Sequence, residues 1–202
     1  MIYLWKKLTL ISILEAIKKN NNIITTAQVV EMGFSRYLLS KYEKEGLLER
    51  ERQGVYTLPD SVHDDMYTLM LCSNKIIFSH ETALFLNGLS DRTPFVHSVT
   101  IPNDTRVSKV IQEECTCYYI KPELYQIGTI TKKTTLGNEV RCYNTERTIC
   151  DLLRSRNRLD EEIVISAVKN YAISPEKDLN LLAIYAEQFG VKKVVENMIF
   201  LS

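Results

Sequence analysis

The chain has 202 residues, with 25 basic and 25 acidic side chains and no formal net charge at pH 7. This balance excludes a general affinity for polyanions, so any nucleic-acid surface has to be local. The hydrophobic content of 45% predicts a folded protein of one large or two modest domains. Residues 1–60 hold 9 of the basic and 7 of the acidic residues, an asymmetry too weak to indicate DNA binding by itself.

Cysteine and histidine spacing indicates no metal site. The five cysteines form no CxxC pair and the three histidines stand alone, so we expect no metal, no cofactor and reduced thiols, as in a cytoplasmic protein. Lys6 and Lys7 follow the first apolar residues instead of preceding them, and polar residues interrupt the next apolar run. This order predicts neither a signal peptide nor a membrane span.

The first helices of the chain have the pattern of a helix-turn-helix. Apolar residues three and four apart predict an amphipathic helix over residues 7–19. Thr25 can cap a second, short helix, with Gln28 returning the bond in a capping box, and Gly33 ends it. Ser35 is expected to cap the next helix, which ends at Gly46. The side chains expected to face the core of this region are Val29, Val30, Phe34, Leu39 and Tyr42.

Residues 48–59 predict a β-hairpin, which would be the wing of a winged helix-turn-helix domain. Gln53 and Gly54 form its turn, because glycine takes positive φ without strain. Side chains alternate along a strand, so Arg50 and Arg52 should lie on one face and the glutamates beside them on the other. The wing would then present arginines to phosphates and turn its carboxylates away.

The residue types on the outward surface of this domain suit DNA. A recognition helix places its N-terminal half against base edges in the major groove, where Arg36 and Lys41 can donate to guanine N7 and O6. Thr25 and Thr26 begin the preceding helix, where free backbone N–H groups can help to hold a phosphate. The expected DNA-binding residues are Thr25, Thr26, Ser35, Arg36, Tyr37, Ser40, Lys41, Lys44, Arg50, Arg52 and Gln53. The same side chains also fit a solvated helix face, on which Lys41 pairs with Glu45.

A second domain of mixed α/β structure with a helical tail is expected over residues 61–202, after a winged helix-turn-helix domain over residues 1–60. The fold class is therefore α+β. Arg147 and Asp151, four residues apart on one helix, are expected to form a surface ion pair. Predicted helices are 64–72, 80–88, 145–153, 160–171, 175–188 and 191–200, and predicted strands are 95–101, 116–120, 128–134 and 139–143.

No catalytic constellation accompanies these elements. The sequence has no GxGxxG, Walker, GxSxG or HExxH motif, and its adjacent acidic pairs point in different directions on a helix. We therefore expect a protein that is not an enzyme.

Three stretches, in this order, resemble the AbiEi-family antitoxins. Residues 11–59, with Phe34-Ser35-Arg36 and Gly54-Val55-Tyr56-Thr57-Leu58, resemble the N-terminal winged helix of that family. Residues 78–89 resemble the segment that opens its second domain. Residues 143–153 resemble its later helix with the Glu-Arg-Thr and Asp-Leu motifs.

The resemblance implies a type IV toxin–antitoxin system that aborts phage infection. It implies an autorepressor that binds inverted repeats of double-stranded DNA in its own promoter through the N-terminal domain. The second domain would counteract a nucleotidyltransferase-like toxin without a stable complex, although no antitoxin residue can be transferred to it. Glu49 and Glu51 depart from the family, whose wings are often more basic or apolar at these positions.

Three alternatives stay open from the sequence. One is a winged-helix regulator, unrelated to toxins, whose residues 61–202 sense a small molecule. Another is an enzyme such as a nuclease, and the third is a winged helix used only for protein docking. The sequence has no long zipper-like helix, so we expect a monomer in solution.

Overall fold

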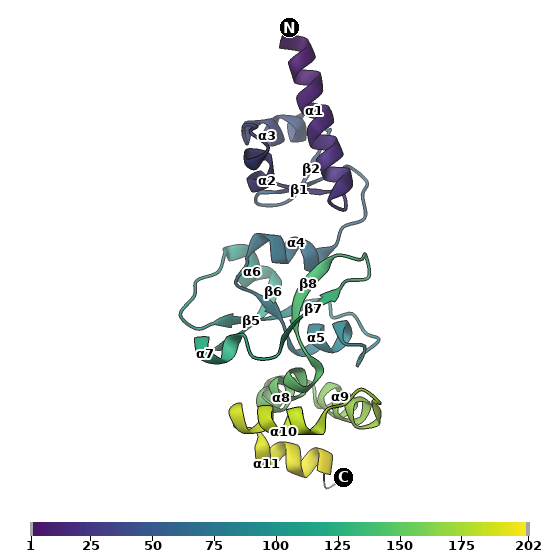
Figure 1. Cartoon of the computed structure of the whole chain (residues 1–202), viewed down its shortest axis with the longest axis vertical. Coiled ribbons are helices and arrows are strands. Elements are labelled where there is room, and N and C mark those ends of the chain that lie inside the picture. The colour runs from purple at the N-terminus through teal and green to yellow at the C-terminus, as the bar shows by residue number, and fades with distance from the viewer. Residues whose placement is uncertain (1, 201–202) are drawn as a thin grey trace. The chain divides into compact units, whose positions relative to one another are not determined.

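In a computed structural model the chain divides into two compact units, residues 1–74 and residues 75–202. The structure describes the backbone of residues 2–200 and the side chains of residues 8–198. Figure 1 follows the chain from the purple and blue elements of the first unit to the green and yellow elements of the second.

The first unit has the winged helix-turn-helix layout that the sequence predicts. Its strands form an antiparallel three-stranded sheet in the order β1-β3-β2, in which β2 and β3 are the wing and β1 was not predicted. With three residues, β1 is too short to show an alternating pattern. The elements are α1 (Ile2–Lys19), β1 (Ile23–Thr25), α2 (Thr26–Glu31), α3 (Tyr37–Lys44), β2 (Glu49–Arg52), β3 (Val55–Thr57) and α4 (Asp65–Cys72).

The core of the first unit lies between α1, α2, α3 and the sheet. Val29, Leu39 and Tyr42 are buried in it as expected, and Phe34 packs against it half-buried. Val30, in contrast, is 54% exposed, so its predicted inward position is wrong. On a six-residue helix only one of two adjacent residues can face the core, and Val29 takes that place.

The turns of the first unit follow its sequence signals closely. Thr25 and Gln28 form the predicted capping box at the start of α2. Gly33 and Gly46 take positive φ values of 82° and 69° at the ends of α2 and α3. Ser35 acts differently from the prediction: α3 has Arg36 as its N-cap residue, and the Ser35 hydroxyl accepts a hydrogen bond from the Tyr37 amide at 3.3 Å.

The first unit extends past residue 60, where the sequence predicts the domain boundary, because α4 packs against the wing. Arg52 of β2 donates hydrogen bonds to the Thr68 hydroxyl and to the Asp65 carboxylate, the latter at 3.4 Å. These bonds join the wing to a helix that follows it in sequence.

The second unit is built on a five-stranded mixed sheet in the order β6-β5-β4-β8-β7. β5 pairs with β6 in parallel, and β4 pairs with β8 in parallel, whereas the other two pairings are antiparallel. The predicted α+β fold class is confirmed, including the hairpin of β7 and β8. The strands are β4 (Ile77–Phe78), β5 (His97–Pro102), β6 (Cys115–Ile120), β7 (Thr129–Lys133) and β8 (Glu139–Tyr143).

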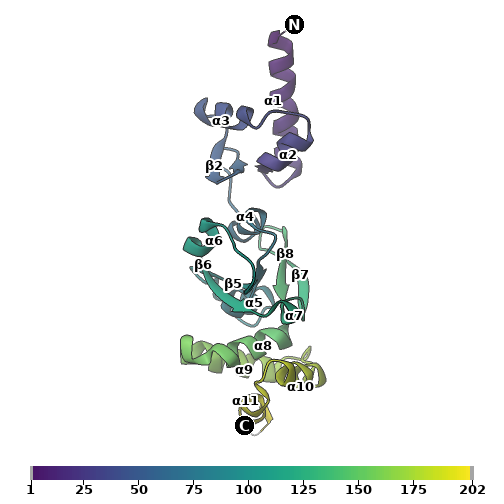
Figure 2. The same ribbon diagram turned by 90° about the vertical axis from the view of Figure 1, so that its left-hand side faces the viewer.

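The helices of the second unit enclose its main core. Figures 1 and 2 show α8 to α11 gathered together, and buried side chains of α8, α9 and α10 pack with Ile77 of β4 and Tyr143 of β8. The helices are α5 (His80–Leu86), α6 (Lys109–Glu114), α7 (Pro122–Tyr125), α8 (Thr145–Ser155), η1 (Arg156–Arg158), α9 (Glu161–Ile173), α10 (Leu179–Gln188), α11 (Lys192–Val195) and η2 (Glu196–Phe200).

The start of α10 corrects one sequence prediction. Pro175 was expected in the first turn of a helix over residues 175–188, but α10 begins at Leu179. Asp178 caps it by accepting a hydrogen bond from the Leu181 amide at 2.9 Å. The Asp178 amide in turn donates to the Glu146 carboxylate at 3.0 Å, so a tertiary contact fixes this start.

Arg147 and Asp151 form an ion pair at 3.0 Å, but it is buried, which contradicts the predicted surface pair. The Arg147 side chain is fully buried, and its guanidinium lies over the rings of Tyr143 and Phe189 at 4.1 and 3.8 Å. It also donates to the carbonyl oxygens at positions 124 and 127. The prediction failed because α8 is covered by neighbouring elements on several sides, so residues 146–153 are all buried.

Candidate nucleic-acid interface

Helix α3 presents a polar face to solvent. Buried Leu39 and Tyr42 anchor its inner side. On the outer side Arg36 and Lys44 are exposed and Tyr37 is 68% exposed, whereas Ser40 and Lys41 are half-exposed. Positions 37, 40, 41 and 44 are three and four residues apart, so they share one face of the helix. The structure thus brings together Arg36, Tyr37, Ser40, Lys41 and Lys44.

The ion pair on α3 between Lys41 and Glu45 is weak. Lys41 lies 3.6 Å from Glu45, and both side chains are substantially exposed. An exposed i,i+4 pair is worth about 0.3–0.5 kcal/mol, which is less than a hydrogen bond to a charged group contributes. Burial raises the pKa of Tyr42, a shift that Lys41 opposes and Glu45 supports, so the anchoring phenol stays neutral. The pair between Lys41 and Glu45 therefore stabilises the domain only weakly.

Thr25 and Thr26 are already engaged within the domain. The Thr25 hydroxyl accepts from the Gln28 amide at 3.2 Å, and the Thr25 amide donates to the Gln28 side chain at 2.8 Å. The Thr26 amide donates to the Gly54 carbonyl at 2.8 Å. The expected free amides at these two residues are therefore absent. Instead, Thr26 joins the start of α2 to the turn of the wing.

The two arginines of the wing lie in different surroundings. The register of β2 against β3 shifts between Arg50 and Arg52, so the predicted strict alternation is broken by a bulge. Arg50 is exposed, as is Gln53 at the turn. The Arg52 side chain is only 9% exposed and is bound to Glu51, Asp65 and Thr68. Arg50 and Gln53 therefore lie open to solvent, whereas Arg52 holds the wing to α4.

The two glutamates of the wing also differ. Glu51 lies 3.1 Å from the Arg52 guanidinium, which balances its charge, and 3.1 Å from the His63 ring. Glu49 is exposed at the first position of β2. The carboxylate nearest to the centre of the wing therefore adds little repulsion toward a polyanion.

The sequence analysis missed Asp65 and Thr68 as partners of the wing. Their spacing of three residues on a helix signals a shared face, but that spacing does not reveal what the face contacts. The bulge in β2 carries no sequence signal that we recognise.

Two searches of the described residues gave no further site type. Within the described part of the chain, no three histidine, cysteine, aspartate or glutamate side chains gather closely enough to hold a metal ion. No helix among these residues combines the length and apolar character that crossing a membrane requires.

Comparison with protein families bears on the first unit. Residues 12–59 match the family model of transcriptional regulators described as AbiEi antitoxin. Over these residues the expected resemblance to AbiEi antitoxins is confirmed. The AbiEi match spans α2, α3 and the wing, and it names a family of regulators and not of enzymes.

Comparison with known proteins and solved structures bears on the whole chain. A search of curated proteins found no match. The crystal structure of the RV2827C protein from Mycobacterium tuberculosis matches with a TM-score of 0.54 and 8% identity, covering 93% of this chain and 79% of that one. At this identity the likeness concerns the fold alone, and it extends over both units.

Proposed function

We propose that this protein is an antitoxin and a transcriptional autorepressor of an abortive-infection system. Its first unit would bind inverted repeats in its own promoter, and its second unit would counteract a nucleotidyltransferase-like toxin without a stable complex. The observation that carries the proposal is the match of residues 12–59 to the AbiEi antitoxin regulators. The exposed polar face of α3 lies inside that segment.

In this proposal α3 is the recognition helix. Arg36 and Tyr37 at its start would meet base edges or phosphates in the major groove, and Ser40 and Lys41 would follow one turn later. A bidentate arginine–guanine pair discriminates against other bases by about 1–3 kcal/mol. Exposed Arg50 and Gln53 on the wing would add contacts that position the domain without reading sequence.

A promoter reporter tests the regulatory half of the proposal. The DNA upstream of the coding sequence should drive a reporter that the full chain represses, and inverting one repeat should relieve repression. Charge reversal by Arg36→Glu should also relieve repression. Lys169→Glu, at an exposed position of α9, makes the same change in charge and serves as the control that should still repress. Full repression by the folded Arg36→Glu variant would contradict the assignment of α3.

Toxin rescue tests the second half of the proposal. Cells that express the cognate nucleotidyltransferase-like protein should survive with the wild-type chain and equally with Arg36→Glu, because rescue would reside in the second unit. Loss of rescue in a stable, well-expressed Arg36→Glu variant would contradict this division of labour.

A further inference from the structure

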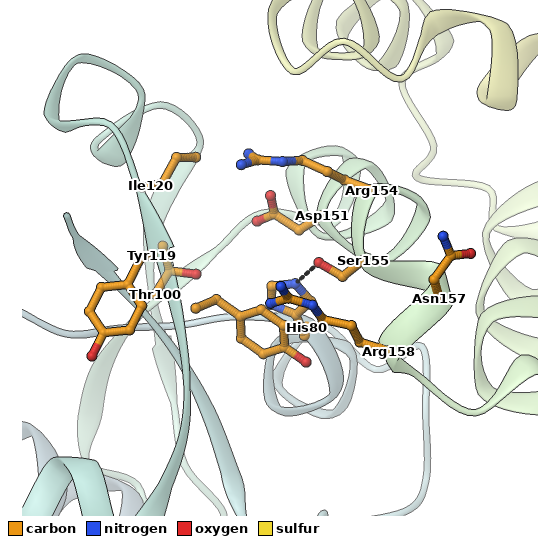
Figure 3. Close-up of a pocket in the computed structure, with 10 residues that line it drawn as sticks. His80, Thr100, Tyr119, Ile120, Asp151, Arg154, Ser155, Asn157 and Arg158 are labelled. Carbon is orange, nitrogen blue, oxygen red and sulfur yellow. Dashed lines mark hydrogen bonds between the residues drawn. The ribbon is translucent and has the colours of Figure 1, made fainter.

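A polar cavity of about 340 Å³ opens in the second unit, in a region that the proposed DNA-binding surface does not include. Its walls come from the start of α5, strands β5 and β6, and the end of α8 with η1. In Figure 3 the side chains of Asp151, Arg154, Ser155 and Arg158 project toward the strands that carry Thr100 and Ile120. The volume suits a small organic ligand.

His80 forms the floor of this cavity in a strained conformation. It takes a positive φ of 48°, which is rare for a residue other than glycine and recurs at functional sites. Its ring is almost fully buried, stacks on Tyr118 with 3.4 Å between centroids, and lies 3.0 Å from the hydroxyls of Ser79 and Ser155. Burial, with Arg147 and Arg154 acting in the same sense, lowers the pKa of His80 to about 3. The floor is therefore rigid and neutral.

Two arginines give the cavity a positive charge. Arg154 and Arg158 are exposed, and among the described side chains no carboxylate lies within 4.0 Å of either guanidinium. Asp151 also lines the cavity, but its carboxylate is held at 3.0 Å by the buried Arg147. Since Arg147 compensates Asp151, the unpaired charge that faces the cavity is cationic.

We propose that this cavity binds a small organic phosphate, such as a sugar phosphate or a nucleotide. Arg154 and Arg158 would hold the phosphate, since guanidinium groups match phosphate oxygens in bidentate geometry. The site would make the second unit responsive to a small molecule, and it does not depend on the proposed DNA binding.

Calorimetric titration of the full chain tests this site with three probes: adenosine 5′-monophosphate, ribose 5-phosphate and inorganic phosphate. We expect at least one ribose-containing probe to bind saturably, and about 10-fold or more tighter than inorganic phosphate. Stronger binding of the nucleotide or of the sugar phosphate identifies which source the site prefers.

Matched variants then assign the contacts. Arg154→Ala and Arg158→Ala should each weaken binding about 10- to 100-fold, whereas Arg156→Ala, exposed between them but outside the cavity lining, should bind as the wild type.

Three results would overturn the proposal. The first is the absence of saturable binding by both ribose-containing probes. The second is inorganic phosphate binding as tightly as either of them, and the third is an equal loss of affinity in Arg156→Ala.

Discussion

Single residues in the second unit show how burial changes the role of a charged or titratable side chain. Arg147 and His80 are both almost fully buried, but only Arg147 has a carboxylate partner, and the pKa of His80 is lowered. Arg147 has a carboxylate, two carbonyls and two aromatic faces as partners. His80 has only two serine hydroxyls and a stacked phenol ring, so desolvation keeps it neutral.

His80 makes the stability of the second unit depend on pH. Its folded-state pKa of about 3 lies below the ordinary value of 6.5, so the unfolded state binds the proton first. Stability is therefore complete above pH 6.5 and falls as the pH is lowered toward 3, by about 2 kcal/mol at pH 5. Thermal unfolding followed by circular dichroism should show a smaller Tm decrease between pH 7 and pH 5 in His80→Asn than in the wild type.

The choice of asparagine in that variant keeps the backbone comparable, because asparagine tolerates the positive φ at this position. An identical decrease of Tm in the wild type and the variant would show that His80 is not the titrating group.

Arg147 is expected to be essential for stability. Arg147→Met leaves the Asp151 carboxylate buried without a partner, so the free energy of unfolding should fall by about 3–5 kcal/mol. The double variant Arg147→Met/Asp151→Asn should recover part of this loss. Urea unfolding measures both, with exposed Arg92→Ala as a control. A loss below about 1 kcal/mol in Arg147→Met would contradict the importance of this ion pair.

At the scale of elements, the wing and α3 divide the basic residues of the first unit between structure and surface. Arg52 binds to α4 and is nearly buried, whereas Arg50, two positions earlier, is exposed. α3 is anchored by two buried side chains and keeps its cations outward. An account of DNA binding therefore has to treat the two wing arginines separately.

The wing arginines should separate in a paired experiment. Arg50→Ala should leave the Tm unchanged and reduce the slope of log affinity against log salt by about 0.9, the value for one lost phosphate contact. Arg52→Ala should lower the Tm and leave the salt slope of the folded fraction unchanged, because its partners are Asp65 and Thr68. The reverse pattern would contradict the roles assigned to them.

The sequence predicted the elements whose signals are local. The capping box at Thr25, the positive-φ glycines that end α2 and α3, and the hairpin around Gly54 depend on neighbouring residues, and the structure bears them out. The predictions for Val30 and Arg147 failed because their environment depends on what packs against a helix. Arg52 presents the same difficulty, since its partner Asp65 on α4 lies 13 residues further along the chain.

The cavity in the second unit could not be predicted from the sequence for the same reason, because its lining residues are even further apart in the chain. Its lining joins residues from position 80 to position 158, which only the folding of the sheet brings together. No sequence motif marked His80 as part of a ligand cavity, and the strain in its backbone is visible only in the structure.

At the scale of the whole molecule, two compact units carry two separate surfaces. The first unit contains the segment that matches the AbiEi antitoxin regulators, and the second contains the cavity. The solved structure of similar fold covers both units, so the likeness in fold extends over both. Substitutions in one surface change no residue of the other, so the two proposals can be tested separately.

The central claim is that the outward face of α3 reads DNA. Fluorescence anisotropy with the native promoter repeat and a scrambled duplex, at several salt concentrations, tests it most directly. We expect Arg36→Glu and Lys41→Glu each to abolish the preference for the native repeat, and Lys169→Glu to retain it together with the steep salt dependence. Undiminished, repeat-specific binding by both α3 variants would contradict the claim.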